Sequence, residues 1–373
     1  MGKGAAQKQN ILVAGAGKVG RVLAGVLCNS VNNLGVMLVD KDVSIAASNT
    51  IPAGVRLIEC DISNVDALSE LIDVHKIQAV VSCLPFFCNF DLAKIAYMHG
   101  CHYFDLTEDV GTTRRIFELS KNSEKAFVPQ CGVAPGLVNI IANDFIKQCD
   151  GVADYVNLYC GALPQDASNA MNHAITWSTE GLVNEYLNPS EVIENAKLTV
   201  VPSLSGLERL VLNEQSFEAF HTSGGVGTLA STYEGSVNSM CYKTIRYPGH
   251  CEKIKLLLAE LGSAADRSVL KGRFEDVMPT TRDDIVITHV CVEGIKENSP
   301  VQFVDTRCFS PSKLGNVMCS AIEMVTSVSA ALIVDAVLSN PKRYAGPMKQ
   351  EDFDFDELFD NPLAGYIKNS RCD

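Results

Sequence analysis

The sequence predicts an α/β protein in which a parallel sheet is followed by a second domain with a mixed, mostly antiparallel sheet. In the first 130 residues, short apolar runs alternate with segments of helical periodicity, a pattern typical of parallel strands buried on both faces. From residue 131 onward, strand-like segments alternate apolar and polar residues, as strands with one solvated face do. The chain of 373 residues is also longer than a domain with a single hydrophobic core usually is, so two domains are expected.

The first domain is predicted to contain six strands with helices between them. Short, mainly apolar runs place strands at residues 10–14, 36–39, 55–58, 79–83, 102–105 and 126–129. Apolar residues at helical spacing place helices at residues 19–27, 67–72 and 91–99. The alternation of strand and helix indicates that the strands run parallel.

A glycine-rich loop follows the first strand, with the sequence Gly15-Ala16-Gly17-Lys18-Val19-Gly20. Gly15 permits a tight turn, Gly17 lets a pyrophosphate approach the backbone, and Gly20 lets helix and strand pack closely. Asp40 stands twenty residues beyond Gly20 at the end of the next strand, as this fingerprint requires. The loop therefore predicts a Rossmann domain that binds a nicotinamide dinucleotide.

Asp40 also predicts which dinucleotide binds. Its carboxylate would accept hydrogen bonds from the adenosine ribose hydroxyls and repel a 2′-phosphate, so NAD is favoured over NADP. The neighbouring Lys41 weakens this preference, and NADP stays possible. Asp61 and Ile62 follow the third strand, where the adenine edge is expected.

The loop after the fourth strand, Cys83-Leu84-Pro85, is expected to face the nicotinamide half of the cofactor. Ligands of Rossmann domains lie outside the carboxyl ends of the strands. Free cysteines are often buried, so the alternative role for Cys83 is that of a small buried hydrophobe.

Composition and charge restrict the classes of partner. Hydrophobic residues make up 47% of the chain and charged residues 20%, as in ordinary globular proteins. The net charge of −13 and the lack of a Lys/Arg cluster argue against nucleic acid and membranes and favour a small-molecule ligand. Residues 1–9 lack the apolar segment of a secretory signal, and the 14 cysteines are scattered without zinc-site spacing. A cytoplasmic location and no bound metal are expected.

The second part of the chain contains strand-like segments at residues 154–160, 197–201, 239–246, 285–293 and 302–308. The apolar stretch 314–338 includes Glu323 and Asp335, which favours a buried helix over a membrane span. The predicted layout is a Rossmann domain at 1–130, a substrate and dimerisation domain at 131–313, a returning helix at 314–345 and a tail at 346–373. The tail is expected to be solvated, or to clasp a neighbour in a homodimer or tetramer.

Four ordered motifs in the second part are more specific than the glycine loop. They are Gln130-Cys131-Gly132-Val133-Ala134-Pro135-Gly136, Cys160-Gly161-Ala162-Leu163-Pro164, Trp177-Ser178-Thr179-Glu180-Gly181-Leu182 and Thr244-Ile245-Arg246-Tyr247-Pro248-Gly249-His250. Together they resemble the saccharopine dehydrogenase (glutamate-forming) and lysine 6-dehydrogenase family over nearly the whole chain. The resemblance implies a Rossmann domain interrupted by an α/β substrate domain. It also implies hydride transfer between nicotinamide and a carbon bonded to nitrogen at the lysine side chain.

The chain departs from saccharopine reductases at three places. It has Ala134-Pro135-Gly136 where they carry Asp-Pro-Gly, and Thr222-Ser223-Gly224-Gly225 where they carry Asn-Arg-Asp-Ser. The missing arginine would leave a glutamyl carboxylate without its fork-shaped partner. Asp40 stands where NADP-using members tend to place a basic side chain. These departures favour NAD-dependent oxidation of free lysine; saccharopine, carboxynorspermidine and a non-catalytic NAD-binding redox sensor stay open.

Oxidation of lysine requires a base or a desolvating pocket, because the amine has an ordinary pKa of roughly 10.4. Asp105 and Glu108 follow a Rossmann strand end and are the first candidates for recognition and proton transfer. The alternative for Asp105 is a turn or cap. His221 precedes a glycine-rich loop and is a third candidate base, although a lone histidine is more often structural.

Substrate contacts are expected from the motifs of the second part. Arg246 suits the α-carboxylate of lysine through bidentate hydrogen bonds, or else fixes the domain interface. Trp177 is the sole tryptophan, and its ring would form an apolar surface for the methylene chain of the substrate, or else belong to the core. Tyr242, next to the Arg246 motif, and Cys131, in the first motif, complete the predicted substrate site.

Overall fold

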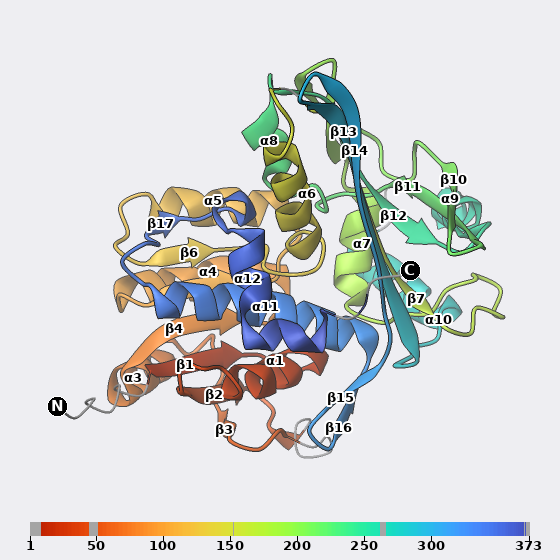
Figure 1. The fold of residues 1–373 in the computed structure, drawn as a ribbon. Coiled ribbons are helices and arrows are strands. Elements are labelled where there is room, and N and C mark those ends of the chain that lie inside the picture. The colour runs from red at the N-terminus through yellow and green to blue at the C-terminus, as the bar shows by residue number, and fades with distance from the viewer. Residues whose placement is uncertain (1–8, 45–50, 152, 262–265, 369, 371–373) are drawn as a thin grey trace.

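A computed structural model describes residues 9–44, 51–151, 153–261, 266–368 and 370. A parallel sheet built mainly from the N-terminal part stands beside a mixed sheet built from the middle of the chain (Figure 1). The predicted α/β class, with a Rossmann-type sheet and a mostly antiparallel second sheet, is confirmed. The expectation about a secretory signal rests on residues 1–9, of which 1–8 lie outside the described residues.

The first sheet has seven strands in the order β17-β6-β5-β4-β1-β2-β3, and every neighbouring pair is parallel. The chain leaves β1 towards β2 on one side and returns to β4 on the other, so a crevice opens at the carboxyl ends of β1 and β4. Its strands are β1 (Gln9–Ala14), β2 (Leu34–Asp40), β3 (Arg56–Glu59), β4 (Ile77–Ser82), β5 (His102–Asp105), β6 (Ala126–Val128) and β17 (Gly346–Pro347).

Helices cover both faces of this sheet. Ile11 and Val13 of β1 belong to the core cluster with α1 (Lys18–Cys28) and α11 (Ala321–Ser339). Leu12 and Ala14 point the other way, into the cluster with α3 (Val65–His75), α4 (Phe86–Met98) and α5 (Val110–Ser120). Because successive residues of a strand face opposite sides, two buried faces explain the continuous apolar runs in the sequence.

The second sheet runs in the order β10-β11-β12-β7-β13-β14, and β8 with its partner β9 joins it at β12. Among the described strands of this second sheet, only β12 and β7 pair in parallel, and all other pairs are antiparallel. The strands are β7 (Ala153–Pro164), β8 (Ser190–Glu194), β9 (Lys197–Val201), β10 (Glu208–Leu212), β11 (Gln215–His221), β12 (Val237–Arg246), β13 (Asp284–Lys296) and β14 (Ser299–Phe309). The helices of this part are α6 (Leu137–Lys147), α7 (Thr179–Leu187), α8 (Leu229–Tyr233), α9 (His250–Leu261) and α10 (Arg267–Val277).

The predicted helix at 314–338 is shorter than expected. Residues Ser312–Leu314 and Val317–Cys319 form a small hairpin, β15 and β16, around the left-handed Gly315. The helix α11 begins at Ala321 because Ser320 and Glu323 form a capping box. By length and composition this helix could cross a membrane, but most of it is buried inside the protein against α1 and β13. It is a core helix of the two-domain fold.

The C-terminal segment returns to the first sheet. Strand β17 pairs with β6, and η1 (Gln350–Asp352), α12 (Phe355–Asp360) and η2 (Pro362–Tyr366) follow it. The side chains of Phe353, Leu358, Phe359 and Leu363 are buried in the main core cluster. The interpretation of this segment as a solvated tail is therefore wrong for its described part, because its aromatic residues pack on the same chain.

Candidate active site

A cavity of about 330 Å³ lies where the carboxyl ends of β1 and β4 face the second sheet. The first domain contributes Gly17, Lys18, Val19, Cys83, Leu84, Pro85, Phe86, Leu106, Thr107 and Glu108. The second part of the chain contributes Gly132, Val133, Ala134, Cys160, Ala162, Trp177, Ser178, Glu180, Gly181, Glu185, Tyr242, Thr244, Arg246, Ile322 and Thr326. Predicted cofactor and substrate residues therefore line one common space.

The glycine loop has the geometry that a dinucleotide requires. Gly15 has a φ of +100°, and a Cβ on Gly20 would lie 1.9 Å from the Gly15 carbonyl oxygen. A Cβ on Gly17 would meet no atom within 4 Å, so open space lies above the start of α1. No side chain caps this helix and its first turn has no acid, which leaves its N–H groups available for a pyrophosphate. The loop fits the predicted cofactor.

The predicted adenosine residues lie outside the cavity, at the ends of β2 and β3. The Asp40 carboxylate accepts a hydrogen bond from the Ala16 amide at 2.7 Å, which ties it to the glycine loop. Lys41 follows Asp40 and is exposed, and Asp61 and Ile62 follow β3. These positions agree with an adenosine half that extends away from the reaction site. The preference of Asp40 for NAD stays a prediction.

Cys83 lies in the cavity wall between the two halves of the site. Its amide donates to the Ala14 carbonyl at 2.8 Å, and its own carbonyl lies against Gly15. Burial raises the pKa of the Cys83 thiol to about 12, so the thiol is neutral at physiological pH. Cys83 therefore shapes the loop that carries Leu84 and Pro85 rather than acting as a nucleophile.

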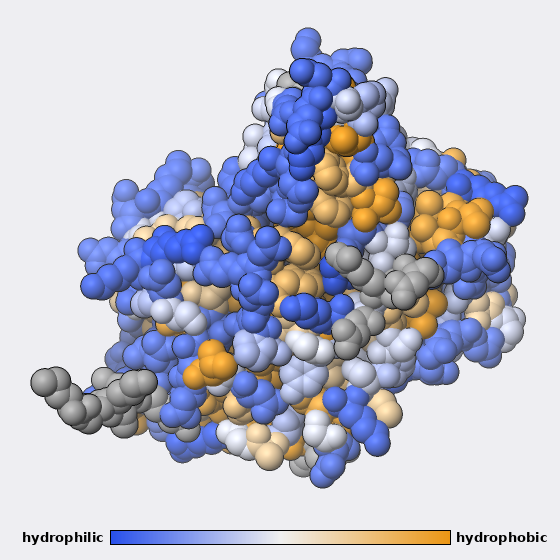
Figure 2. Space-filling view, in the orientation of Figure 1, coloured by the Kyte–Doolittle hydropathy of each residue, from blue (hydrophilic) through white to orange (hydrophobic). Residues whose placement is uncertain are grey.

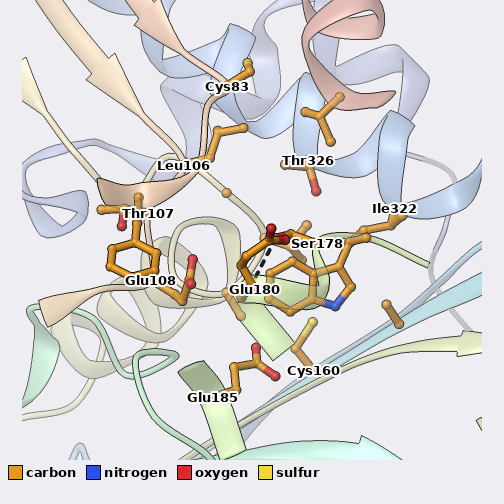
Figure 3. A pocket seen from close by; sticks show the side chains of 18 of the residues that line it. Cys83, Leu106, Thr107, Glu108, Cys160, Ser178, Glu180, Glu185, Ile322 and Thr326 are labelled. Atoms are coloured by element: carbon orange, nitrogen blue, oxygen red, sulfur yellow. Dashed lines mark hydrogen bonds between the residues drawn. The ribbon is translucent and has the colours of Figure 1, made fainter. Parts of the chain in front are cut away.

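Three glutamates line the cavity, Glu108 from the first domain and Glu180 and Glu185 from the second (Figure 3). Glu180 is paired with Lys271 at 2.6 Å. Glu108 stands three residues beyond β5, and Glu185 lies on α7. Burial raises the pKa of Glu108 to about 7. Burial also raises the pKa of Glu185 to about 8, against the opposing effect of Arg246 and with a further increase from Glu108. These carboxyl groups change charge near neutral pH, as a catalytic acid or base must.

Glu185 is also incompletely hydrogen-bonded. Its Oε2 atom is buried and has no hydrogen-bond partner in the described part of the chain, and the Arg246 Nη2 atom stands 3.7 Å away. A buried acceptor without a donor is unfavourable. A ligand that donates hydrogen bonds into the cavity would relieve this cost.

Asp105 does not line the cavity, which corrects its predicted contact with cofactor and amine. It is fully buried, and its carboxylate accepts hydrogen bonds from the Thr107 amide at 2.9 Å, the Gln130 amide at 3.2 Å and the Tyr103 hydroxyl at 3.0 Å. Burial raises its pKa to about 6. Asp105 holds the turn that presents Glu108, so the structure supports the alternative role.

His221 is not in the cavity, and its assignment as a base is wrong. It lies opposite Lys243 in the β11–β12 pair, and opposed residues of an antiparallel pair share a face of the sheet. Tyr242, Thr244 and Arg246 occupy the other face, which lines the cavity. The His221 ring packs on Gly206 instead.

Cys131 is also outside the cavity. Its thiol is buried and donates to the Val128 carbonyl at 3.0 Å. The residues that follow it, Gly132 to Ala134, form the cavity wall in its place.

The Arg246 side chain lines the cavity but its donors are largely used by the protein. Its Nε donates to the Tyr186 hydroxyl at 3.0 Å, and its Nη1 donates to Thr244 Oγ1 at 2.8 Å and to the Ile245 carbonyl at 2.9 Å. The residue is only 2% exposed. Nε and Nη1 are therefore occupied within the protein, whereas Nη2 stands 3.7 Å from Glu185 Oε2, so the predicted bidentate grip on a substrate carboxylate through two nitrogens is wrong. Arg246 holds α7 and Glu185 in position.

Trp177 and Tyr242 line the cavity as predicted, and each lies on a glycine. A Cβ on Gly181 would stand 2.2 Å from the Trp177 indole, and a Cβ on Gly225 would stand 2.3 Å from the Tyr242 ring. These two glycines give the aromatic rings the room to lie flat against the wall. Trp177 remains partly exposed to the cavity, as an apolar wall for a substrate chain would be.

The sequence interpretation missed several lining residues, of which Glu185 is the most consequential. A helix from Thr179 was recognisable, because Ser178 caps it by accepting from the Gly181 amide. Glu185 lies one turn beyond Gly181 on that helix and so shares its face. The other missed residues are Phe86, Leu106, Thr107, Gly132, Val133, Ala134, Cys160, Ala162, Ser178, Glu180, Gly181, Thr244, Ile322 and Thr326.

Comparison with known proteins agrees with this architecture. Residues 11–129 match the family model described as the saccharopine dehydrogenase NADP binding domain, and residues 132–368 match the saccharopine dehydrogenase C-terminal domain. The chain belongs to the saccharopine dehydrogenase family. It is therefore an oxidoreductase of that family with a nicotinamide dinucleotide as cofactor.

The fold is similar to that of the apo saccharopine dehydrogenase (L-Glu forming) from Saccharomyces cerevisiae. That similarity has a TM-score of 0.75 at 14% identity and covers 94% of this chain and 96% of the yeast chain. Weaker similarities include C. glutamicum DAP dehydrogenase in complex with DAP, with a TM-score of 0.49, 10% identity and 97% and 99% coverage. A probable dehydrogenase from Thermotoga maritima has a TM-score of 0.47, 12% identity and 97% and 96% coverage.

Proposed function

We propose that this member of the saccharopine dehydrogenase family oxidises the C–N bond at the end of an amine, as lysine 6-dehydrogenases do with lysine. The observation that carries the proposal is the pair of carboxylates, Glu108 and Glu185, in the cavity that the dinucleotide loop also lines. The raised pKa values of both groups place their titration near neutral pH. Oxidation of an amine requires such an acceptor, since the ammonium proton must leave before the neighbouring carbon is oxidised.

Each of these residues has its own role in the proposed reaction. Glu108 and Glu185 bind the ammonium group, and Glu185 accepts its proton, because Oε2 has no hydrogen-bond partner among the described residues. Trp177 and Leu106 provide apolar wall for the methylene chain. The hydrogen bond from the Thr107 amide to Asp105 holds the turn that positions Glu108 at the cavity. The dinucleotide, when bound along the glycine loop, supplies the acceptor for the hydride that leaves the carbon next to nitrogen.

Two features support lysine over saccharopine within the same reaction class. Ala134 lines the cavity without adding a charge, and Gly225 lies so close to Tyr242 that no side chain fits there. The segment at residues 222–225 therefore brings no basic group to the substrate. Saccharopine remains the second candidate, because both family models carry its name.

A spectrophotometric screen tests the proposal. NADH or NADPH production is measured with lysine, saccharopine and carboxynorspermidine, each with NAD and with NADP. We expect the fastest reaction with lysine and NAD, because Asp40 lies where a 2′-phosphate would be repelled. No turnover with any amine, together with tight NAD binding, would favour a redox sensor.

We further propose a homo-oligomer in the cytoplasm that uses its second domain for subunit contact. Apolar side chains gather on the part of the surface where the second domain lies (Figure 2). The exposed apolar residues of that domain include Val200, Val211 and Val304. Analytical ultracentrifugation of the wild type and of a Val211→Lys variant would test this contact, and a monomeric wild type would refute it.

A further inference from the structure

Arg21 lies in α1, one turn beyond Gly17 of the glycine loop, and only 8% of the residue is exposed. Its backbone amide donates to the Gly17 carbonyl at 3.3 Å, and its Nε atom donates to the same oxygen at 3.1 Å. Two donors therefore hold this carbonyl towards the helix and away from the open space above Gly17. The orientation matters because a phosphate is bound by N–H groups at a helix start and is repelled by a carbonyl oxygen.

A buried carboxylate attracts the guanidinium group of Arg21. Glu323 of α11 is fully buried. Burial lowers the pKa of Arg21, and the nearby Glu323 carboxylate opposes that effect. An arginine keeps its charge even so. Arg21 Nη1 and Glu323 Oε1 are both buried, and neither has a hydrogen-bond partner in the described part of the chain. The positive charge of Arg21 is therefore not neutralised by a hydrogen-bonded ion pair with Glu323.

Glu323 is itself fixed by residues from the side of the second domain. Its Oε2 atom accepts hydrogen bonds from Arg282 Nη2 at 2.7 Å and from the Ser320 amide at 2.9 Å. Arg282 stands two residues before β13 of the second sheet. Helix α11 contacts α1 a second time, where the Ser327 hydroxyl donates to the Val19 carbonyl at 3.2 Å. The start of α1 is thus supported by side chains that are themselves held in place.

We propose that Arg21 is a positioning residue for the pyrophosphate of the dinucleotide. Its Nε–H group keeps the Gly17 carbonyl turned into the helix, so that the N–H groups of the first turn face the phosphates. Its buried charge lies under the positive end of α1 and strengthens the attraction of that end for anions. The inference requires only that a nicotinamide dinucleotide binds, and it does not depend on the proposed oxidation of an amine.

Isothermal titration calorimetry with ADP-ribose and adenosine tests the role of Arg21 without turnover. ADP-ribose contains the pyrophosphate, whereas adenosine has no phosphate. Arg21→Met removes the charge and the Nε donor, so the dissociation constant of ADP-ribose should rise by about tenfold or more. That of adenosine should stay within about twofold of the wild-type value. Arg21→Lys keeps the charge, and its dissociation constant for ADP-ribose should lie within about threefold of the wild-type value.

The matched control is Arg273→Met, which removes an exposed arginine of α10 that pairs with Asp276 at 3.4 Å. It should leave the affinities for both ligands unchanged. Unchanged binding of ADP-ribose by Arg21→Met would overturn the inference. Equal losses for ADP-ribose and adenosine would overturn it as well, because they would show that Arg21 supports the fold of the domain and not the pyrophosphate.

A measurement on the wild type decides the question if Arg21→Met does not fold. The arginines are labelled with ¹⁵N, and the Nε–H resonance of Arg21 is assigned by its absence in Arg21→Lys. We expect this resonance to shift when ADP-ribose binds and to stay in place when adenosine binds, because Nε contacts the loop that receives the pyrophosphate. A resonance that responds to neither ligand, or equally to both, would contradict the inference. Neither experiment uses an amine, so the result leaves the proposed reaction to its own test.

Discussion

The pH dependence of turnover follows directly from the carboxylate pair. An ordinary glutamate titrates near pH 4.5, whereas the pKa of Glu108 is about 7 and that of Glu185 about 8. Both pKa values are raised, so the base form appears only as the pH rises past these values. At pH 6 an acceptor with a pKa of about 8 is ionised in about 1% of molecules, so kcat/KM should be about 100-fold below its plateau.

The assay is kcat/KM for lysine between pH 5 and pH 10, which reports the free enzyme. The two groups interact, so the acid limb belongs to the pair and is expected between about pH 7 and pH 8. Glu108→Gln removes a like charge, which should lower the pKa of Glu185 and move the limb to lower pH. Arg246→Met removes the opposite charge and should move the limb to higher pH. A limb near pH 4.5 that neither variant moves would refute the assignment of the base.

Three further substitutions test other parts of the site. Asp40→Ala should relax the preference for NAD, and an unaltered ratio of kcat/KM for NAD and NADP would count against its role at the ribose. Gly181→Ala places a methyl group where the Trp177 ring lies, so the substrate KM should rise and the tryptophan emission should shift; an unchanged spectrum would argue that the ring does not depend on this contact. Glu351→Ala removes the acceptor of the hydrogen bond from the Thr228 hydroxyl and should lower the free energy of unfolding by about 1–2 kcal/mol in urea denaturation. The exposed control Glu357→Ala should change it less, and equal effects would show that the buried bond adds nothing.

The Rossmann sheet could be predicted because its signals are local. Burial on both faces produces runs such as Ile11 to Ala14, and the glycines of the loop are required by contacts within one strand, turn and helix. Strands β8 and β10 were not predicted, because each has only five residues and acidic residues adjoin its short apolar run. The helix predicted from Leu314 included most of the hairpin at Ser312–Cys319, because the apolar residues Val317, Met318 and Cys319 stand just before the apolar α11.

The candidate site was harder to predict than the sheet because it depends on contacts between distant segments. His221 and Tyr242 are both near glycines in the sequence, and only the pairing of β11 with β12 shows that they face opposite sides. The Nε donor of Arg246 is occupied by the Tyr186 hydroxyl, sixty residues away, and this contact could not be predicted from the motif of Arg246. Glu185 lies in a recognisable helix, but its partner Glu108 lies in the other domain.

The raised pKa of Glu108 is a consequence of contact between the two domains. The loop that bears it would be open at the carboxyl edge of an isolated Rossmann sheet, where water keeps a carboxyl group near its ordinary pKa. In this protein the Gly224 segment of the second domain lies on it, so closely that a Cβ there would stand 2.4 Å from the Glu108 carbonyl oxygen. The negative charges of Asp109 and Asp105, in the first domain, raise the pKa of Glu108 further. The proposed base therefore lies where the domains meet, which explains why a dinucleotide could be predicted from one domain whereas the proposed chemistry depends on both.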